Sequence, residues 1–201
     1  MSLPLKINYE IILASASPRR KQIFNELGLK PQIIPVNIDE FNYRQLSPEE
    51  YVMDLAAKKS GAVAQNHPDK IVVGADTIVV VDETILEKPL HREDARKMLN
   101  MLSGRSHKVI TGVNINRHNC QKTFIEITKV YFKKLSNKEI EWYLDSGEPF
   151  DKAGSYAIQG LGRILIEKIE GCYFNVVGFP IHHFYYELQN LLENVNKPEN
   201  K

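Results

Sequence analysis

An aspartate lies inside one of the most hydrophobic stretches of this sequence. Residues 71–81 read IVVGADTIVVV, so Asp76 follows Gly74 within a run of β-branched residues. A buried carboxylate is unfavourable unless a cation, a metal ion or hydrogen bonds compensate for it, and a nearby glycine lets a ligand or another backbone approach closely. Because uncompensated buried acids are uncommon, the pattern favours a functional role for Asp76 over a purely structural one.

Two consecutive arginines follow a short apolar segment near the start of the chain. Residues 15–20 read SASPRR, and Pro18 is suited to the first turn of a helix. The start of a helix presents N–H groups and partial positive charge that bind anions, and arginine can form paired hydrogen bonds with phosphate. Since cations are unfavourable at a helix start, Arg19 and Arg20 indicate either a bound anion or a capped helix with solvated arginines. The spacing alone favours neither.

Three further polar residues are ambiguous when each is taken alone. Glu40 ends the segment NIDE, where a carboxylate could join phosphates and water around Mg²⁺, although a solvated loop is the better explanation for this segment taken alone. Lys88 could offset phosphate charge or lower the pKa of a carboxylate, and a plain loop lysine is the more common case. Gln159 lies in the glycine-rich segment 151–162, which is typical of a binding loop but lacks the GxxxxGK[ST] pattern of a P-loop. The amide of Gln159 suits the edge of a base.

The charges of the chain nearly balance, with 26 Lys and Arg residues against 25 Asp and Glu residues. A nucleic-acid-binding protein usually has a basic excess, so no nucleic acid polymer is expected as a partner. No run of about 18 apolar residues is present, so no membrane span is expected. The two cysteines, Cys120 and Cys172, lack CxxC spacing, which argues against a disulfide framework or a zinc site and favours reduced thiols in the cytoplasm.

Alternating patterns along the chain predict the elements that must position these residues. Strands are expected where β-branched residues gather or alternate with polar ones, at 11–14, 32–36, 71–81, 85–86, 107–116, 123–132, 164–169 and 173–177. Helices are expected up to 27, at 48–64 and 93–102, up to 144, and from 180 onward. Capping-box patterns begin at Ser47 and Ser136. This order predicts an α/β protein with a long mixed β-sheet flanked by helices and a cleft between two lobes.

Six segments together resemble the Maf family of nucleotide pyrophosphatases, within the wider Maf/Ham1-type superfamily. They are LASASPRR (13–20), GADTIVVV (74–81), LEKP (86–89), LSGRSHKVITGV (102–113), EPFDKAGSYAIQGLG (148–162) and VVGFPI (176–181). They occur in the order of the family and cover nearly the whole chain. The resemblance implies a Maf/Ham1 (inosine triphosphate pyrophosphatase-like) fold, with an elongated mixed sheet and two lobes around a cleft. It further implies a single Maf-like domain over 1–201, a polar tail at about 195–201, and a frequent homodimer.

The same resemblance implies roles for individual residues. Asp76 matches the catalytic acid, the proton acceptor for the attacking water, and also a metal ligand, while Glu40 matches a carboxylate on the metal side. Substrate-binding groups of the family match Ser15, Ser17, Arg19, Arg20, Lys59, Thr77, Lys88 and Gln159. Among these, Arg19, Thr77 and Gln159 match positions linked to substrate choice. The implied cofactor is a divalent metal cation, Mg²⁺ or Mn²⁺.

The implied reaction is hydrolysis of a nucleoside triphosphate at the α–β phosphate bond, which yields a monophosphate and pyrophosphate. The form KAGSYAIQG at 152–160 resembles the branch that acts on dTTP and UTP, although Ser155 and Ala157 stand where KAGAYGIQG is common. A modified pyrimidine nucleotide is a further candidate substrate. Two alternatives stay open: a nucleotide-binding regulator of cell division and septum formation without essential catalysis, and a specialist for 7-methyl-GTP or inosine triphosphate.

Overall fold

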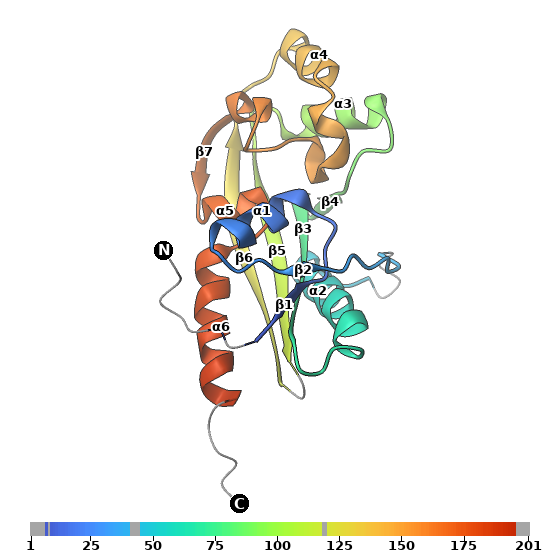
Figure 1. Ribbon diagram of the computed structural model, residues 1–201. Coiled ribbons are helices and arrows are strands. Elements are labelled where there is room, and N and C mark those ends of the chain that lie inside the picture. The colour runs from blue at the N-terminus through green and yellow to red at the C-terminus, as the bar shows by residue number, and fades with distance from the viewer. Residues whose placement is uncertain (1–6, 8, 41–44, 118–119, 196–201) are drawn as a thin grey trace, which may run out of the picture. The chain divides into compact units, whose positions relative to one another are not determined.

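The fold combines seven strands with six α-helices among the residues that the computed structural model describes, which are 7, 9–40, 45–117 and 120–195. The strands are β1 (Ile11–Leu13), β2 (Gln32–Ile33), β3 (Ile71–Val81), β4 (Thr84–Leu86), β5 (Ser106–Arg117), β6 (Cys120–Phe132) and β7 (Ile166–Glu170). The helices are α1 (Pro18–Glu26), α2 (Pro48–Ala64), α3 (Arg92–Leu102), α4 (Asn137–Asp145), α5 (Tyr173–Val177) and α6 (Ile181–Val195) (Figure 1). Short 3₁₀ helices are η1 (Glu148–Asp151), η2 (Ala153–Ser155) and η3 (Leu161–Leu165). The predicted mixed α/β class is confirmed.

All seven strands belong to one mixed sheet, with β4 paired to β3 and the others in the order β2-β1-β3-β5-β6-β7. The short strand β1 is parallel to both of its neighbours, so that Ile12 pairs with Gln32 on one side and with Val72 on the other. Strand β4 is antiparallel to β3, and β7 is antiparallel to β6. The parallel pairs β2-β1-β3 place Leu13, the end of β1, beside Val73 of β3, three residues before Asp76.

The contacts within the chain divide it into two compact units. The first unit contains residues up to Asp76, 112–125 and the residues from Phe179 on, and the second contains 77–111 and 126–178. Strands β3, β5 and β6 therefore contribute residues to both units. The single domain over 1–201 and the cleft between two lobes stay predictions. The tail expected at about 195–201 falls almost entirely outside the described residues.

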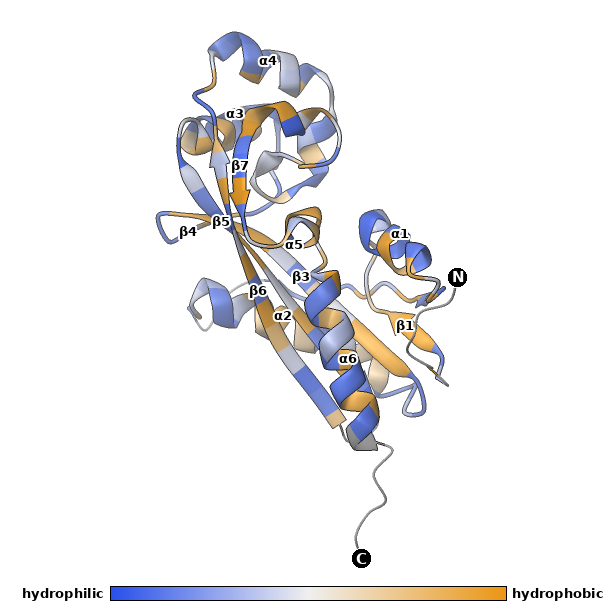
Figure 2. Ribbon diagram, turned by 90° about the vertical axis from the view of Figure 1, so that its left-hand side faces the viewer, coloured by the Kyte–Doolittle hydropathy of each residue, from blue (hydrophilic) through white to orange (hydrophobic). Residues whose placement is uncertain are grey.

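The first unit has helices on opposite sides of its strands, with α2 on one side and α6 on the other (Figures 1 and 2). Helix α2 begins with a complete capping box, in which Ser47 and Glu50 exchange hydrogen bonds with each other's backbone, as predicted. Three aromatic rings pack together where α1 meets α6: Phe24 of α1 lies 4.9 Å from Phe179 and 5.2 Å from Phe184 of α6 between ring centroids. Burial of rings of this size dominates the stabilisation of a core.

The second unit has its own hydrophobic core, in which α3 packs against α4. Leu99, Leu102 and Tyr143 are among its fully buried side chains. The second predicted capping box, between Ser136 and Glu139, is also confirmed. In the part of the chain that the structure describes, every helix is too short or too polar to span a lipid bilayer.

One predicted strand is wrong, because residues 173–177 form the helix α5 instead. The β-branched pair Val176 and Val177 suggested a strand, but tertiary contacts overrode that propensity. The side chain of Asn175 donates hydrogen bonds to the Val109 carbonyl and the Thr128 hydroxyl, both at 3.0 Å. Gly178, with φ +117°, then ends the helix in a conformation that other residues rarely adopt.

The strand predicted at 32–36 is shorter than expected and ends at Ile33. Ile34 still donates a backbone hydrogen bond to Leu13, but Pro35 has no N–H with which to continue the ladder. The strand predicted at 164–169 likewise begins later, at Ile166, since the preceding residues form the 3₁₀ helix η3.

Candidate functional site

The carboxylate of Asp76 forms an ion pair with the ammonium of Lys59. The Nζ atom of Lys59 lies 2.6 Å from Oδ1 of Asp76 and 2.7 Å from Oε1 of Glu40, so one cation bridges two carboxylates. The side chains of Lys59 and Asp76 are 11% and 14% exposed, while that of Glu40 is 56% exposed. The cluster is therefore mostly buried at Lys59 and open to solvent at Glu40.

The packing of α2 against β3 explains how Lys59 reaches Asp76. Residues two apart on a strand point to the same face, so Gly74 and Asp76 share the face that α2 covers. A Cβ atom on Gly74 would lie 2.3 Å from the Ala56 carbonyl oxygen and 2.6 Å from the Ser60 nitrogen. Only glycine permits this approach, and the approach places Lys59, which comes just before Ser60, beside the strand.

Arg20 is a buried arginine that links α1 to the end of β3. It is 9% exposed, and its NH1 group donates to the Ala75 carbonyl at 2.9 Å and to the Ser15 hydroxyl at 3.1 Å. The Ser15 hydroxyl also accepts a hydrogen bond from the backbone N–H of Ser17. Ser17 in turn caps α1 by accepting from the backbone N–H of Arg20. The predicted helix start at SASPRR is confirmed, and Arg20 binds the residue directly before Asp76.

The local charges act on Asp76 in opposite directions. Burial raises the pKa of the Asp76 carboxyl above its ordinary value, although the nearby Lys59 and Arg20 favour its ionised form and Glu40 disfavours it. Burial also lowers the pKa of the Arg20 guanidinium, against the attraction of Asp76. A guanidinium keeps its charge even so. The acid predicted within the hydrophobic run is thus compensated by two cations, which is what its burial requires.

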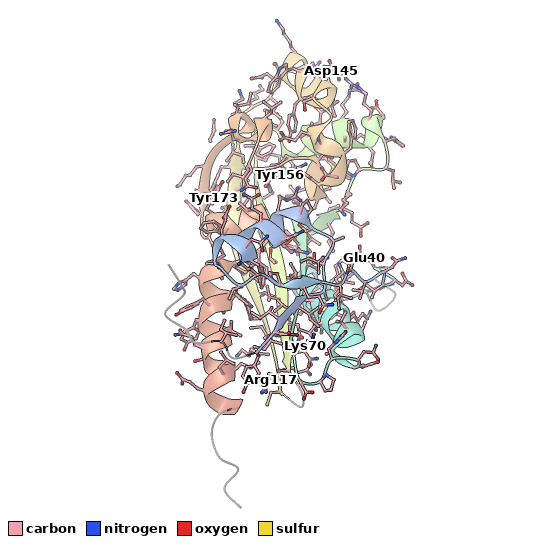
Figure 3. All side chains as sticks on the ribbon, viewed as in Figure 1. Glu40, Lys70, Arg117, Asp145, Tyr156 and Tyr173 are labelled. Carbon is pink, nitrogen blue, oxygen red and sulfur yellow. The ribbon has the colours of Figure 1, made fainter. Side chains whose placement is uncertain are left out.

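Glu40 comes from the segment between β2 and α2 (Figure 3). Its backbone carbonyl accepts a hydrogen bond from the hydroxyl of Tyr51, a buried residue in the first turns of α2. This bond fixes the chain at Glu40 while leaving its side chain to meet Lys59. No group of three or more His, Cys, Asp or Glu side chains suited to a metal ion occurs among the residues that the structure describes.

The remaining predicted residues lie partly in each unit. Arg19 is half-buried and follows Pro18 at the start of α1 in the first unit. Thr77 belongs to the second unit, where its hydroxyl lies 2.9 Å from that of Thr111 and 3.4 Å from the Gly178 carbonyl. Thr77 is adjacent to Asp76 in β3, so the chain itself connects these two residues.

Lys88 and Gln159 are both exposed and both belong to the second unit. A backbone hydrogen bond joins their two segments, since the N–H of Gly154 donates to the Glu87 carbonyl at 3.1 Å. Gly154 has φ +66°, and a Cβ atom on it would lie 2.9 Å from Val79 side-chain atoms. The glycine thus lets the loop that carries Gln159 pack directly on β3.

Tyr156 and His107 belong to the core of the second unit. Tyr156 is a core residue, 5% exposed, whose hydroxyl lies 2.7 Å from Nε2 of His107. His107 also packs edge-on against Phe132, so it is a structural residue of this core. Sequence reasoning missed Tyr51 as a residue that contacts the candidate site. Its signal is weak, since it acts through a hydrogen bond to the backbone carbonyl of Glu40, 11 residues earlier in the sequence.

Fold and site together define a class of α/β proteins with a carboxylate held between buried cations at the middle of a mixed sheet. The structure of the Staphylococcus aureus Ham1 protein matches the fold, with a TM-score of 0.55 and 17% identity over 93% of this chain and 100% of that chain. The sequence profile described as Maf-like protein matches residues 10–191. The chain belongs to the Maf family.

Curated relatives are similar over most of their length. A dTTP/UTP pyrophosphatase of Bacillus velezensis is 49% identical over 85% of this chain and 90% of its own. A dTTP/UTP pyrophosphatase of Caldicellulosiruptor saccharolyticus is 42% identical over 94% of this chain and 98% of its own. The likeness therefore covers most of the chain and extends across both units.

Proposed function

We propose that this chain hydrolyses dTTP and UTP to the monophosphate and pyrophosphate with the help of a divalent metal ion. The observation that carries the proposal is the 42–49% identity, over nearly the whole chain, to relatives that are dTTP/UTP pyrophosphatases. The cluster around Asp76 supports it, since a partly exposed carboxylate beside two cations suits the attack of water on an anionic substrate. A protein that only binds nucleotide does not need a buried carboxylate, whose burial is energetically unfavourable.

The residues present fit a magnesium-like ion. Glu40 and Asp76 supply hard carboxylate oxygens, and Mg²⁺ takes one or two such ligands together with water and substrate phosphates. That both carboxylates already share one cation, Lys59, indicates that this place favours positive charge. Glu40 and Asp76 would hold the metal, which would lower the pKa of bound water and offset charge on the phosphates. Mg²⁺ and Mn²⁺ are the proposed ions.

Asp76 is the proposed proton acceptor for the attacking water. A free aspartate has a pKa of about 3.9 and is a weak base, so the rise in the pKa of Asp76 through burial improves it for this task. Lys59 and Arg20 favour the ionised form of the carboxylate and are also proposed to offset the charge of the phosphates. The hydroxyls of Ser15 and Ser17 complete the small, polar start of α1.

The second unit is proposed to supply further substrate-binding groups. Lys88 is the candidate cation there, and Gln159 is the candidate for reading the edge of the pyrimidine base, together with Thr77 and Arg19. A site built to hydrogen-bond one base edge penalises analogues that lack the matching groups. These roles rest on the resemblance of the motifs and on the exposure of Lys88 and Gln159. The homodimer also stays a prediction, which sedimentation analysis can test.

The proposal is tested by incubating the purified chain with Mg²⁺ and a panel of triphosphates that includes dTTP, UTP, CTP, 7-methyl-GTP and inosine triphosphate. Pyrophosphate and orthophosphate are measured separately. We expect pyrophosphate and monophosphate from dTTP and UTP in preference to the others. Orthophosphate as the only product, or preference for a purine nucleotide, would contradict the proposal. Nucleotide binding without turnover would instead favour the regulatory alternative.

A further inference from the structure

The carboxylate of Glu148 joins the two ends of the loop that carries Gln159. Glu148 begins η1, before the loop, and its Oε2 atom accepts a hydrogen bond from the Leu161 N–H at 2.8 Å. Its Oε1 atom accepts from the Gly162 N–H at 3.0 Å. Both donors come directly after the loop, so this one side chain closes the segment 149–160 at its base.

A buried tyrosine extends the same network to the near side of Gln159. The hydroxyl of Tyr143, which is fully buried, lies 2.9 Å from Oε1 of Glu148 and accepts a hydrogen bond from the Ala157 N–H at 3.2 Å. Because the hydroxyl accepts from Ala157, its own proton is directed to Glu148. Backbone groups on both sides of Gln159 are therefore held by one network, by the Glu148 carboxylate after it and by the Tyr143 hydroxyl before it, while the side chain of Gln159 itself is exposed.

Two glycines make this close arrangement possible. Gly160 has φ +82°, and a Cβ atom on it would lie 2.4 Å from Oε2 of Glu148. A Cβ atom on Gly162 would lie 2.6 Å from the Tyr143 hydroxyl oxygen and 2.5 Å from the Ala157 carbonyl oxygen. Any larger residue would push the loop away from the carboxylate. Gly160 and Gly162 thus permit the close contact with Glu148 and Tyr143.

We propose that Glu148 is a positioning residue, which fixes the loop so that Gln159 is presented to the base of the nucleotide in one conformation. This inference rests on the proposed function and assigns a role to a residue outside the predicted site. A loop ordered before binding loses less conformational entropy when the substrate arrives. The role requires a carboxylate, because all three neighbours donate hydrogen bonds, and the amide of a glutamine would turn N–H groups toward some of them.

A double-mutant cycle tests whether Glu148 acts through Gln159. Glu148→Gln, Gln159→Ala and the double variant are compared with the wild type by kcat and KM for UTP and for CTP. We expect Glu148→Gln to lower kcat/KM for UTP by about 10-fold or more, mainly through KM, and to reduce the preference for UTP over CTP. In the Gln159→Ala background the same change should have little further effect, since coupled residues are not additive.

The control variant is Glu139→Gln, which removes another carboxylate of the second unit that accepts a hydrogen bond from a backbone N–H, that of Ser136 at 2.8 Å. It should leave the preference for UTP unchanged. If Glu148→Gln does not fold, Tyr143→Phe removes only the hydroxyl that links Glu148 to Ala157, and it should weaken the preference in the same direction.

Hydrogen exchange gives a reading that does not depend on turnover. The amides of Leu161 and Gly162 should exchange faster in Glu148→Gln than in the wild type or in Glu139→Gln. Additive effects in the cycle, or unchanged exchange at these amides, would overturn the positioning role while leaving the proposed function intact. A wild type that exchanges as expected but does not hydrolyse UTP would overturn the proposed function, and with it the purpose assigned to the loop.

Discussion

The ammonium of Lys59 lies 2.6 Å from the Asp76 carboxylate and is only 11% exposed, so this ion pair is largely withdrawn from water. Exposed ion pairs contribute little to stability, and a buried pair is often no better than a hydrophobic substitute. An arrangement of this kind in the middle of a β-strand is therefore better explained by chemistry than by stability. Asp76 is also 14% exposed, which leaves it within reach of a water molecule.

Replacing Asp76 tests that explanation. Asp76→Asn keeps the shape of the side chain but removes its basicity and its charge, so kcat for UTP should fall by about 10² or more. The fold should survive, because Lys59 keeps Glu40 as a partner. Activity is measured by release of pyrophosphate, and folding by circular dichroism. Asp69→Asn, at an exposed position just before β3, is the control. Wild-type turnover in Asp76→Asn would refute the catalytic assignment.

Removal of the divalent metal should abolish turnover, and adding Mg²⁺ or Mn²⁺ should restore it.

Glu40→Gln should raise the concentration of Mg²⁺ needed for half-maximal activity by about 10-fold, since a second carboxylate ligand strengthens metal binding. Glu10→Gln is a matched control, because Glu10 is an exposed glutamate that pairs with Lys70 at 2.6 Å in the same unit. The same Mg²⁺ requirement in both variants would remove Glu40 from the metal site.

The contact of α2 with β3 can be tested by two glycine substitutions of opposite effect. Gly74→Ala should destabilise the protein by about 1–3 kcal/mol, since its new methyl group would overlap backbone atoms of α2. Gly61→Ala, within α2, meets no atom within 4 Å and should stabilise by about 0.5–1 kcal/mol through helix propensity. Urea unfolding measures both. Equal stabilities would show that α2 does not depend on Gly74 for its approach.

The buried His107 predicts how stability depends on pH. Burial lowers the pKa of His107 from 6.5 to about 4 in the folded protein, and its Nδ1 atom has no hydrogen-bond partner among the described residues. Between these values the unfolded chain binds a proton that the folded protein does not, so stability is full above pH 6.5 and is lost as the pH falls toward 4.

The measurement compares the wild type with His107→Phe, which cannot titrate at this position. Across this pH range the free energy of unfolding of the wild type should fall more steeply than that of the variant, by up to about 1.4 kcal/mol per pH unit. Carboxylates titrate in both proteins and cancel in the difference. Parallel pH profiles would mean that folding does not lower the pKa of His107.

Local signals in the sequence were sufficient for most of the elements. The capping residue Ser47 and the proline after it locate the start of α2, and the predicted end at Ala64 is confirmed. However, which face of that helix turns toward the sheet depends on contacts that are distant in the sequence. Lys58 and Lys59 look alike in the sequence, yet Lys58 pairs with Asp54 one turn earlier on the same helix while Lys59 turns inward to Asp76. Only the packing against Gly74 distinguishes them.

The residues of the candidate site were likewise only partly predictable from the sequence. Asp76 stands out by its polarity within a hydrophobic run, and the resemblance of the motifs indicates most of its companions. Glu148 does not stand out, because its partners are backbone N–H groups 13 and 14 residues further along the chain. Hydrogen bonds to backbone groups leave no pattern of residue types, and so no inspection of composition or periodicity could have revealed the closure of this loop.

The cluster in the first unit has an even balance of charge, with the cations Lys59 and Arg20 against the ionised carboxylates of Asp76 and Glu40. These four groups therefore exert little net pull on an approaching polyanion, and their contribution to its rate of capture should be nearly insensitive to ionic strength. Discrimination between substrates therefore depends on short-range contacts within the site. Because an ammonium has three N–H donors, Lys59 can donate to a phosphate oxygen while it still pairs with Asp76 and Glu40, so substrate binding need not break the ion pair that positions the acid.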